Sequence, residues 1–544
     1  MGLRRVGAAV LALVLCFGLV GCGGQQEHAE SAQGRDDTSG ISTVTVSMTP
    51  SSEPAAGFDP LVGWGAGEHV HEPLIQSTLI TTDNELNFQN DLATSYDCSD
   101  DGMTWTFHIR DDVKFSDGEP LTAADVAFTI NGIVNGAAAE ADLSMVREAV
   151  ATDDTTCVLH LVRPNNALIY TLAVVGIVPE HAYGPEYGEH PVGSGRYLLE
   201  EWKRGEQVIL RANPDYYGEK PSIERLVVVF MEEDASLAAA QAGVVDVAYT
   251  SAQLAANVPS GYGLLNCKSV DSRGISLPSM PMSSAGKVVD GDMVYQVGNE
   301  VTSDIAVRRA LNYGVDRDRM IEHVLNGYGT PAYSVSDGTP WYNEAMAVQT
   351  DVEQAKALLE EGGWTLGEDG VRSKEGVTCG FDLYYAAGDS TRQALAYDVA
   401  EQCAQLGIAV TPKGASWDDI YPRQYTDPVL WGWGSNSPVE LYELTYSKGW
   451  GNYPCYESAE VDAALEAAQA ASSIEASYPF YQKAQWDPTT GTGVAPQGAA
   501  TWLWLANVDH LYFAREGLLV ADQKPHPHGH GWSLVNNIDK WSWA

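Results

Sequence analysis

The sequence predicts an α/β protein with more than one domain. Residues 379–410 read as a strand, a helix and a second strand, and such a unit favours a parallel sheet with helices packed on its faces. Strand and helix patterns are mixed along the rest of the chain without an internal repeat. A chain of 544 residues also exceeds what one hydrophobic core usually supports, so two or three domains are expected.

The first half of the chain carries local signals for both kinds of element. Thr122 is placed as the N-cap of a helix, and Asp125 follows it in the first turn. Arg204 and Gly205 form a turn between two strand-like runs. The expected strands are 43–50, the two runs within 196–217, and 225–231. A helix is expected at 122–134. Residues 234–249 are expected to begin as a short helix, stop at a glycine and end as a further strand.

The second half begins with helices. Residues 303–329 predict two helices that are broken at 314–316, and 351–364 predicts a helix closed by Gly362 and Gly363. The last residues, 536–543, are expected to form a final strand.

The N-terminal residues have the pattern of an export signal. Arg4 and Arg5 precede about fifteen apolar residues, which is short for a membrane span and typical of a secretory signal. Small residues lead into Cys22, as in a bacterial lipobox, so we expect a lipoprotein signal peptide over 1–21 and lipidation of Cys22. The alternative is an ordinary signal with a chance cysteine. Residues 22–42 are polar and predict a flexible tether.

The net charge of the chain limits the classes of partner that it can bind. The chain has 31 Lys and Arg against 73 Asp and Glu, a net charge of −42. Such an excess of negative charge argues against nucleic acid and against anionic lipid surfaces as partners.

The cysteines beyond Cys22 do not have the spacing of a zinc site. None form a CxxC or CxxH pair. An even number, six, in an exported protein permits up to three disulfides with fifteen possible connectivities. The sequence suggests Cys98 with Cys157, which each lie beside a strand-like run and could link neighbouring strands, and Cys379 with Cys403, which lie on a strand and on the helix that follows it.

Three long stretches resemble one protein family. Residues 101–130, 191–230 and 306–332 are similar to segments of the extracytoplasmic solute-binding proteins of the peptide/nickel class, the large receptors of ABC importers. The resemblance implies a two-lobed periplasmic-binding-protein-like α/β fold with an extra subdomain in lobe I, and a ligand buried in the cleft as the lobes close by a hinge motion. It places lobe I at 43–270 plus 505–544, with the subdomain at about 81–191, and lobe II at 271–504.

No catalytic arrangement is recognised. The sequence Gly193–Gly195 lacks the full GxSxG elbow, and the histidines of His69–Glu72 are not spaced as in HExxH. There is no P-loop or GxGxxG fingerprint, so we do not expect an enzyme.

The resemblance places one loop in the cleft. It implies that Trp431 and Trp433 grip the ligand with their rings and that Ser435 and Asn436 orient it by hydrogen bonds. The alternative is that both tryptophans belong to the core of lobe II. Peptide-binding relatives commonly carry an acid in this loop, whereas here the nearest acid is Glu440.

Further ligand candidates lie elsewhere. Arg273, at the expected inter-lobe strand, suits a carboxylate, unless it forms a salt bridge between the lobes. Trp64, His69 and His71 are expected at the start of a lobe I helix bordering the cleft, with a helix-surface role as the alternative for the histidines.

Three histidines alternate with proline and glycine near the C-terminus. His526, His528 and His530, together with His69 and His71, are candidate metal ligands because clustered imidazoles suit Ni, Cu or Zn. The alternative is a connecting segment whose histidines pack or form hydrogen bonds.

Together these signals favour the substrate-binding lipoprotein of an ABC importer that captures a short peptide or a nickel-chelate complex. We expect a monomer held on the outer side of the cell membrane by the lipid on Cys22, with ABC permease subunits as partners, and Ni(II) only as part of the ligand rather than as a required cofactor. The alternatives are a secreted metal-dependent hydrolase and a sensor or adhesion lipoprotein without a transport role.

Overall fold

The structure is a computed structural model that describes residues 42–544 apart from 67–68, 137–140, 283–286, 291–292 and 529–530. The predicted signal peptide, Cys22 and nearly all of the tether lie outside the described residues. Among the residues that are described, no helix is long and apolar enough to cross a membrane.

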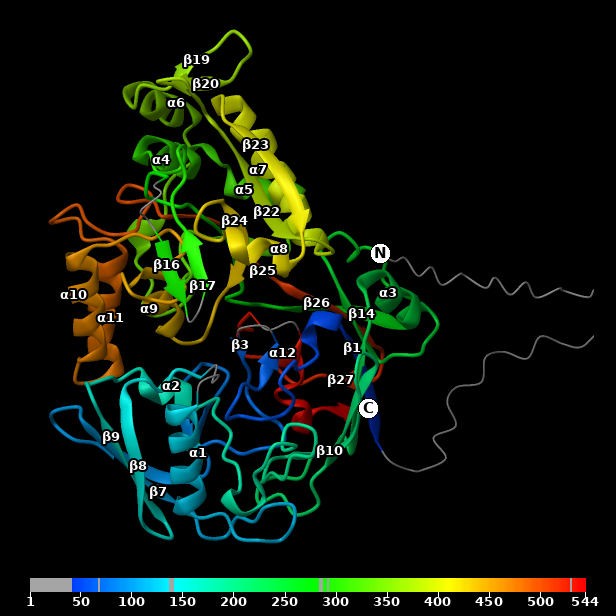
Figure 1. Cartoon of the computed structure of the whole chain (residues 1–544). Helices are drawn as coiled ribbons and strands as arrows, with labels where there is room; N and C mark the ends of the chain where they lie inside the picture. The colour runs from blue at the N-terminus through cyan, green and yellow to red at the C-terminus, as the bar shows by residue number, and fades with distance from the viewer. Residues whose placement is uncertain (1–41, 67–68, 137–140, 283–286, 291–292, 529–530) are drawn as a thin grey trace, which may run out of the picture. The chain divides into compact units, whose positions relative to one another are not determined.

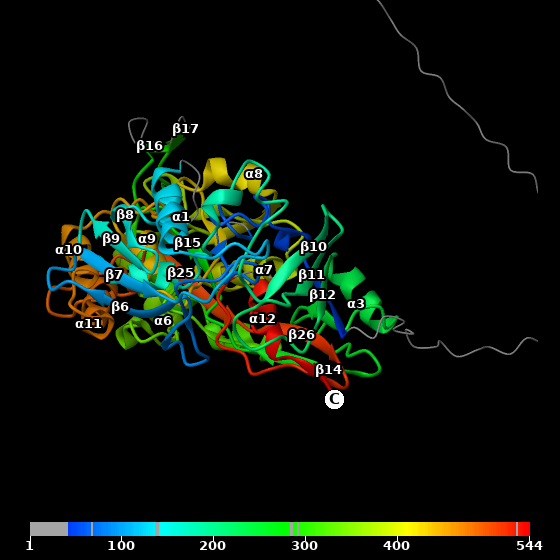
Figure 2. The same cartoon turned by 90° about the horizontal axis from the view of Figure 1, so that it is seen from below.

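The first sheet has seven strands and contains the predicted N-terminal strand at its centre (Figures 1 and 2). Val44, Val46 and Met48 are fully buried, which explains why this segment forms a central strand. β1 runs parallel to β12 and β13. The strands, in spatial order, are β10 (Tyr197–Lys203), β11 (Gln207–Ala212), β12 (Arg225–Phe230), β1 (Thr43–Met48), β13 (Val247–Thr250), β26 (His510–Arg515) and β14 (Tyr262–Cys267), and α3 (Glu233–Gln241) precedes β13.

The second sheet has six strands and holds the predicted strand–helix–strand unit. β22 pairs in parallel with β23, and α7 (Ser390–Leu406) connects them, which confirms the predicted unit. The strands, in spatial order, are β18 (Gly329–Pro331), β25 (Trp502–Val508), β15 (Ser272–Ser276), β24 (Val429–Trp433), β22 (Gly380–Ala386) and β23 (Ala409–Ala415).

The helices of the second half begin and end close to the predicted positions. α4 (Ile305–Gly314) and α5 (Arg317–His323) are separate helices because the Asp316 side chain caps α5 by accepting a hydrogen bond from the Arg319 amide at 3.0 Å. α6 (Val352–Glu361) ends at Gly362, as predicted. The remaining elements of this half are α8 (Trp417–Ile420), α9 (Val439–Thr445), α10 (Ala459–Gln469), α11 (Ile474–Gln485), β16 (Lys287–Asp290), β17 (Met293–Gln296), β19 (Thr365–Leu366), β20 (Arg372–Lys374) and β21 (Val377–Thr378).

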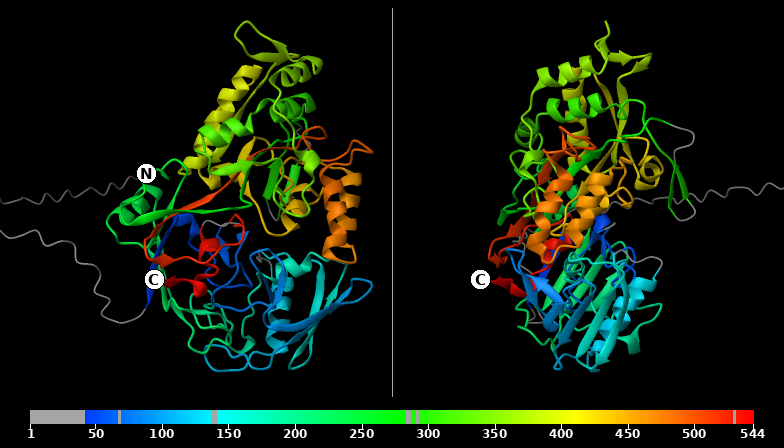
Figure 3. Two further views of the ribbon diagram at one scale, coloured as in Figure 1. Left: turned by 180° about the vertical axis from the view of Figure 1, so that it is seen from behind. Right: turned by 90° about the vertical axis from the view of Figure 1, so that its left-hand side faces the viewer.

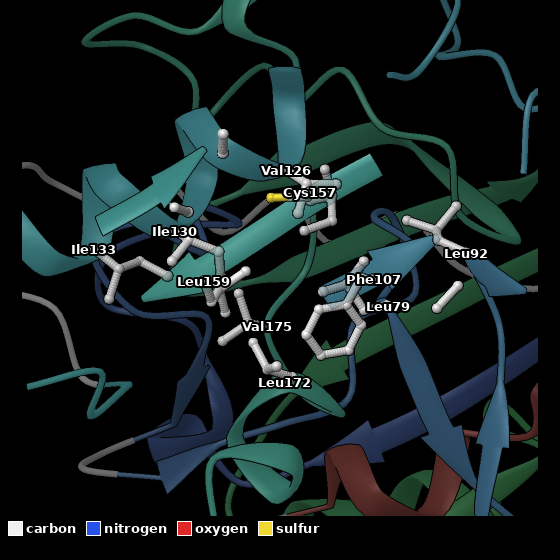
Figure 4. Close-up of a cluster of buried hydrophobic side chains, with 14 of the residues drawn as sticks. Leu79, Leu92, Phe107, Val126, Ile130, Ile133, Cys157, Leu159, Leu172 and Val175 are labelled. Carbon is white, nitrogen blue, oxygen red and sulfur yellow. The ribbon is translucent and has the colours of Figure 1, made fainter. Parts of the chain in front are cut away.

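A four-stranded sheet and a helix form the subdomain beside the first sheet. α1 (Ala123–Asn135) starts at Thr122, which forms a capping box with Asp125, so the predicted helix start is confirmed. Figure 4 shows its inward residues Val126 and Ile130 packed with Phe107 of the sheet. The strands are β6 (Ala93–Cys98), β7 (Thr104–Ile109), β9 (Thr156–Leu161) and β8 (Val146–Asp153), with α2 (Leu168–Leu172) after them and the short pairs β2 (Gly65–Ala66) with β3 (His69–Val70) and β4 (Ile80–Thr82) with β5 (Phe88–Asn90) before them.

The chain crosses between the two large sheets twice. The first crossing joins β14 to β15, and the second joins β25 to β26 after Val508. The tail then returns to the first sheet, as Figure 3 shows, where Trp532 donates a hydrogen bond to the Ser52 carbonyl at 2.6 Å. The predicted final strand 536–543 is wrong over most of its length. After α12 (Trp532–Val535), residues 538–540 form a 3₁₀ turn, and only β28 (Ser542–Trp543) pairs, with β27 (Leu518–Leu519).

The disulfides suggested by the sequence are not formed. Cys98 and Cys157 lie on β6 and β9, on opposite sides of β7, so two strand spacings of about 4.8 Å each separate them, more than a disulfide spans. Cys379 and Cys403 are both buried, and they pack as free thiols in the core of the second sheet.

The subdomain also contacts the helical hairpin α10–α11 (Figures 1 and 3). Asn166, just before α2, donates its side-chain amide to the carbonyls of Ala468, Ala471 and Ser473, each at 3.1 Å, and its backbone amide donates to Gln469 at 2.9 Å. These carbonyls lie at and just beyond the C-terminal end of α10, where helices leave acceptors unsatisfied. This contact therefore connects the two halves of the protein.

Replacing Asn166 by Leu should weaken the contact between the halves. Carbonyls left without a donor cost about 1–3 kcal/mol. The family resemblance implies a solute held by closure of two lobes, so its affinity should fall about tenfold or more, although Asn166 lines neither of the cavities described below. Calorimetric titration with the solute checks this. Asn135→Leu is the matched control, since that side chain donates to the Asn131 carbonyl of the same helix at 2.8 Å. Equal affinities in the two variants would remove the contact from the closing mechanism.

Candidate ligand-binding site

The carboxyl ends of parallel strands from both sheets meet at one cavity of about 550 Å³. The first sheet contributes the residues that follow β1, β12 and β13, and the second sheet contributes those that follow β22 and β23 together with β24 itself. Ligands of open α/β sheets bind outside the carboxyl ends of the strands, and the volume lies in the usual range for small-molecule sites. The cavity is thus lined from both sheets.

Aromatic rings form one wall of the cavity. Trp431 and Trp433 lie two residues apart on β24, and Trp431 stacks between Trp417, at 5.5 Å between ring centroids, and Tyr453, at 4.3 Å. Tyr421 packs against the same stack. A flat wall of this kind offers a large apolar contact to a planar or aliphatic group of a ligand.

Gly432, which lies between the two tryptophans in the sequence, leaves room beside β24 for charged groups. A Cβ at this position would lie 2.6 Å from the Arg392 guanidinium, 2.8 Å from that of Arg273 and 2.6 Å from the His528 ring. The absent side chain therefore lets two arginines and a histidine approach the strand.

Two arginines, Arg273 and Arg392, line the cavity. Both are buried, and the Nε atom of each has no hydrogen-bond partner within the described part of the chain. Arg273 pairs with Asp271, and Arg392 donates to Asp389 at 2.5 Å. Burial lowers the pKa of Arg392, while Asp389 opposes that shift. Two guanidinium groups with donor capacity left over suit an anionic ligand group.

One hydrogen bond joins the two halves at the rim of the cavity. Glu233, the first residue of α3, accepts from the Ser390 hydroxyl at 2.9 Å, and Ser390 is the first residue of α7. The same carboxylate accepts from the Ser251 amide at 3.1 Å. The rim contact therefore belongs to the arrangement in which the two sheets are close together.

A second, smaller cavity of about 190 Å³ lies on the other side of His528. Ser435, Asn436 and His71 line it, and Asn436 donates to the Pro525 carbonyl at 2.9 Å. Burial, and then the nearby Asp142, raise the pKa of Glu443 in its wall to about 7. Glu440 accepts from the Gly434 amide at 2.7 Å.

The structure separates the residues predicted from the sequence. Arg273, Trp431 and Trp433 line the larger cavity, whereas Ser435 and Asn436 line the smaller one. Trp64 lines neither: it packs in the core of the first sheet, 5.0 Å from the rings of both Phe58 and Trp532.

The helix expected at Trp64, His69 and His71 does not form. β2 and β3 form a short antiparallel hairpin there, with Ala66 opposite His69. Glycines at 63, 65 and 67 disfavour a helix, which explains the difference. The side chain of His69 lies outside the described residues.

Two of the C-terminal histidines, His526 and His528, are held by contacts within the protein. His528 donates from Nδ1 to Asp271 at 2.7 Å, and the Nδ1 atom of His526 lies 3.1 Å from that of His510. His530 lies outside the described residues. Among the side chains that are described, no three of His, Cys, Asp or Glu are arranged to hold a metal ion.

Sequence reasoning missed several residues of the larger cavity. Arg392, Asp389 and Trp417 reach it from the ends of β22 and β23, and His510 reaches it from β26. The N-cap pattern at Asp389, directly after a predicted strand, was the available signal for the first two. Nothing local in the sequence indicated His510.

Two sheets joined by two crossing segments, with a solute-sized cavity lined from both, define the class of solute-binding proteins. The chain belongs to the bacterial extracellular solute-binding proteins, family 5: the model of that family's middle region matches residues 87–453. The predicted family is therefore confirmed.

Individual relatives agree with this assignment. The chain is 34% identical to Protein XP55 of Streptomyces lividans over 486 residues, covering 85% of this chain and 83% of the relative. It is 27% identical over 429 residues to the oligopeptide-binding protein AppA of Bacillus subtilis, covering 74% and 76%.

Solved structures show the same fold. NikZ of Campylobacter jejuni, in complex with Ni(L-His), has a TM-score of 0.77 at 23% identity and covers 92% of this chain and 99% of its own. The B. subtilis AppA structure, in complex with a nonapeptide, has a TM-score of 0.72 at 24% identity with the same coverage. The predicted two-lobed α/β fold is confirmed.

Proposed function

We propose that this chain is the substrate-binding lipoprotein of an ABC importer and that it captures a short peptide or a nickel-chelate complex in the larger cavity. One observation supports this most strongly: Arg273, Arg392 and the tryptophans of β24 surround a space lined by both sheets. Peptides and metal chelates both present carboxylates, which these guanidinium groups suit.

Capture proceeds by closure of the two halves. A solute that touches both sheets gains its full binding energy only when they are close, so it shifts the population toward the closed form. The Glu233–Ser390 and Asn436–Pro525 hydrogen bonds then form across the gap. The permease subunits recognise this closed form and take up the solute.

The same proposal specifies the location of the protein and its need for a cofactor. Cys22 carries the lipid that holds a monomer on the outer side of the membrane. Ni(II) enters only as part of a chelate ligand, and no resident cofactor is needed. The relatives bind the two ligand classes: NikZ holds Ni(L-His) and AppA holds a nonapeptide.

Native mass spectrometry with metal analysis of protein purified without a histidine tag tests the proposal. The expected result is one bound solute that carries an acid group, either a peptide or a nickel complex. Stoichiometric nickel that is lost on joint replacement of His526, His528 and His530 by Ala would assign the chelate. Protein that retains no solute and binds neither Ni(L-His) nor short peptides would contradict the proposal.

Trp433→Ala should weaken solute binding by about 1–3 kcal/mol, the scale of a buried aromatic anchor. Trp433→Phe keeps a ring and should recover part of the loss. Calorimetric titration measures both, after circular dichroism shows that each variant is folded. Trp543→Ala, at a half-exposed residue near the C-terminus, is the control. An affinity of Trp433→Ala equal to that of the control would place Trp433 in the core alone.

A further inference from the structure

The contact between the subdomain and the α10–α11 hairpin lies far from the two crossings. Figures 1 and 3 show it on the opposite side of the molecule from β14 and β26, the strands that lead into and out of the crossings. The larger cavity is lined by Asp271 and Val508 at the crossings, and the smaller cavity by Tyr170 and Thr171 beside the hairpin. Both cavities therefore lie between the crossings and this contact.

The polar part of the contact covers the end of α10. Arg163 donates a hydrogen bond to the side chain of Gln469, which is buried. The Gln469 carbonyl accepts from the Asn166 backbone amide, and the Asn166 side chain donates to the carbonyls around it. Helices leave these last carbonyls without partners of their own. The subdomain therefore supplies donors that the hairpin lacks, and each of these bonds favours the joined arrangement.

The apolar part of the contact exchanges side chains between two hydrophobic cores. Tyr170 packs on Phe88 of the subdomain, at 4.8 Å between ring centroids, and edge-on against Trp341 of the second half, at 5.9 Å. Its hydroxyl also shares a hydrogen bond with that of Tyr478 on α11. In the other direction Ile474, the first residue of α11, packs on the core of the subdomain. Apolar packing of this kind restricts the relative motion of domains.

We propose that residues 163–170 and the α10–α11 hairpin form a latch that holds the two halves together before any solute binds. Arg163, Asn166 and Ile474 line neither cavity, so their contacts do not depend on what the cavities contain. The latch must open for a solute to enter or leave, and the closed fraction of the solute-free protein sets the apparent affinity. The latch is made of protein groups alone, so it goes beyond the proposed function and serves whichever solute is bound.

Replacing Ile474 by Asp should open the latch. The side chain packs on the subdomain core, where a carboxylate would lose its hydration, so the variant favours separated halves. The hairpin should stay folded, because Ser473 still caps α11 and an acid in the first turn of a helix interacts favourably with the helix dipole. Phe480→Asp is the matched control, since it places the same charge on the same helix at a residue that is 39% exposed.

Small-angle X-ray scattering of the full-length protein, stripped of solute, measures the separation of the halves. The expected result is a larger radius of gyration for Ile474→Asp than for the wild type, and equal radii for the wild type and Phe480→Asp. Hydrogen exchange on the same samples should show the Asn166 amide, which donates to Gln469, exchanging about tenfold or more faster in Ile474→Asp. Circular dichroism shows whether each variant is folded.

Equal radii for the stripped wild type and Ile474→Asp would overturn the proposed latch, because the halves would then be apart already or held by other contacts. If Ile474→Asp does not fold, Asn166→Leu takes its place, with Asn135→Leu as its control, and the same comparison decides. Because no solute is added, the result does not depend on the proposed function. Loss of solute binding and loss of the latch are therefore separate outcomes.

Discussion

Replacing Arg392 by Met should remove most of the affinity for the solute. The guanidinium lines the cavity next to Gly432, and truncating one partner of a buried charged contact costs about 2–5 kcal/mol. The fold should survive, because Asp389 still caps α7 by accepting from the backbone amide of residue 392 at 2.8 Å. Calorimetric titration with the solute found by mass spectrometry measures the effect.

Arg147→Met is the control for this prediction. Arg147 is an exposed arginine of the subdomain that pairs with Glu148 at 3.2 Å, and surface pairs of this kind contribute little. Its affinity should match that of the wild type. If Arg392→Met bound the solute as tightly as the control, the anionic end of the ligand would have to be placed elsewhere.

Gly434→Ala should destabilise the protein by at least about 2 kcal/mol, through backbone strain and overpacking together. The residue has a φ of +144°, and a Cβ there would lie 1.9 Å from the carbonyl oxygen of Val270. The Gly434 carbonyl also accepts from the His528 amide at 2.8 Å, so the tail should loosen with the loop. Urea unfolding measures the loss of stability.

Gly205→Ala separates strain from crowding. Gly205 has a φ of +73° in an exposed turn, with nothing within 4 Å of an added Cβ. It should cost only about 1 kcal/mol. A Gly434→Ala variant as stable as Gly205→Ala would show that the loop containing Gly434 can move away from Val270 without loss of folding free energy.

The elements of the fold could be predicted because their signals are local. The capping box at Thr122 and the cap at Asp316 each stand within a few residues of the helix that they start. The tail was misjudged because its apolar residues are buried in a turn and a short helix rather than in a strand. Tertiary packing overrides local preference there.

The cavity was less predictable because its residues come from strand ends far apart in the sequence, which are brought together only when the chain crosses between the two large sheets. Arg273 and the β24 tryptophans were found through the family resemblance, whereas Arg392 and His510 depend on the ends of strands distant in sequence. Tryptophan is a residue type that often contacts ligands, but the C-terminal tail brings Trp532 against Trp64 and buries Trp64 in the core. No pattern near Trp64 indicates that contact.

Hydrogen exchange with and without the solute tests the central claim most directly, namely that one solute is held between the two sheets. The account predicts that residues 249–252 of the first sheet and 388–392 of the second become protected together when the solute is added back to stripped protein, since both segments line the same cavity. Protection of only one segment, or of neither, would contradict it.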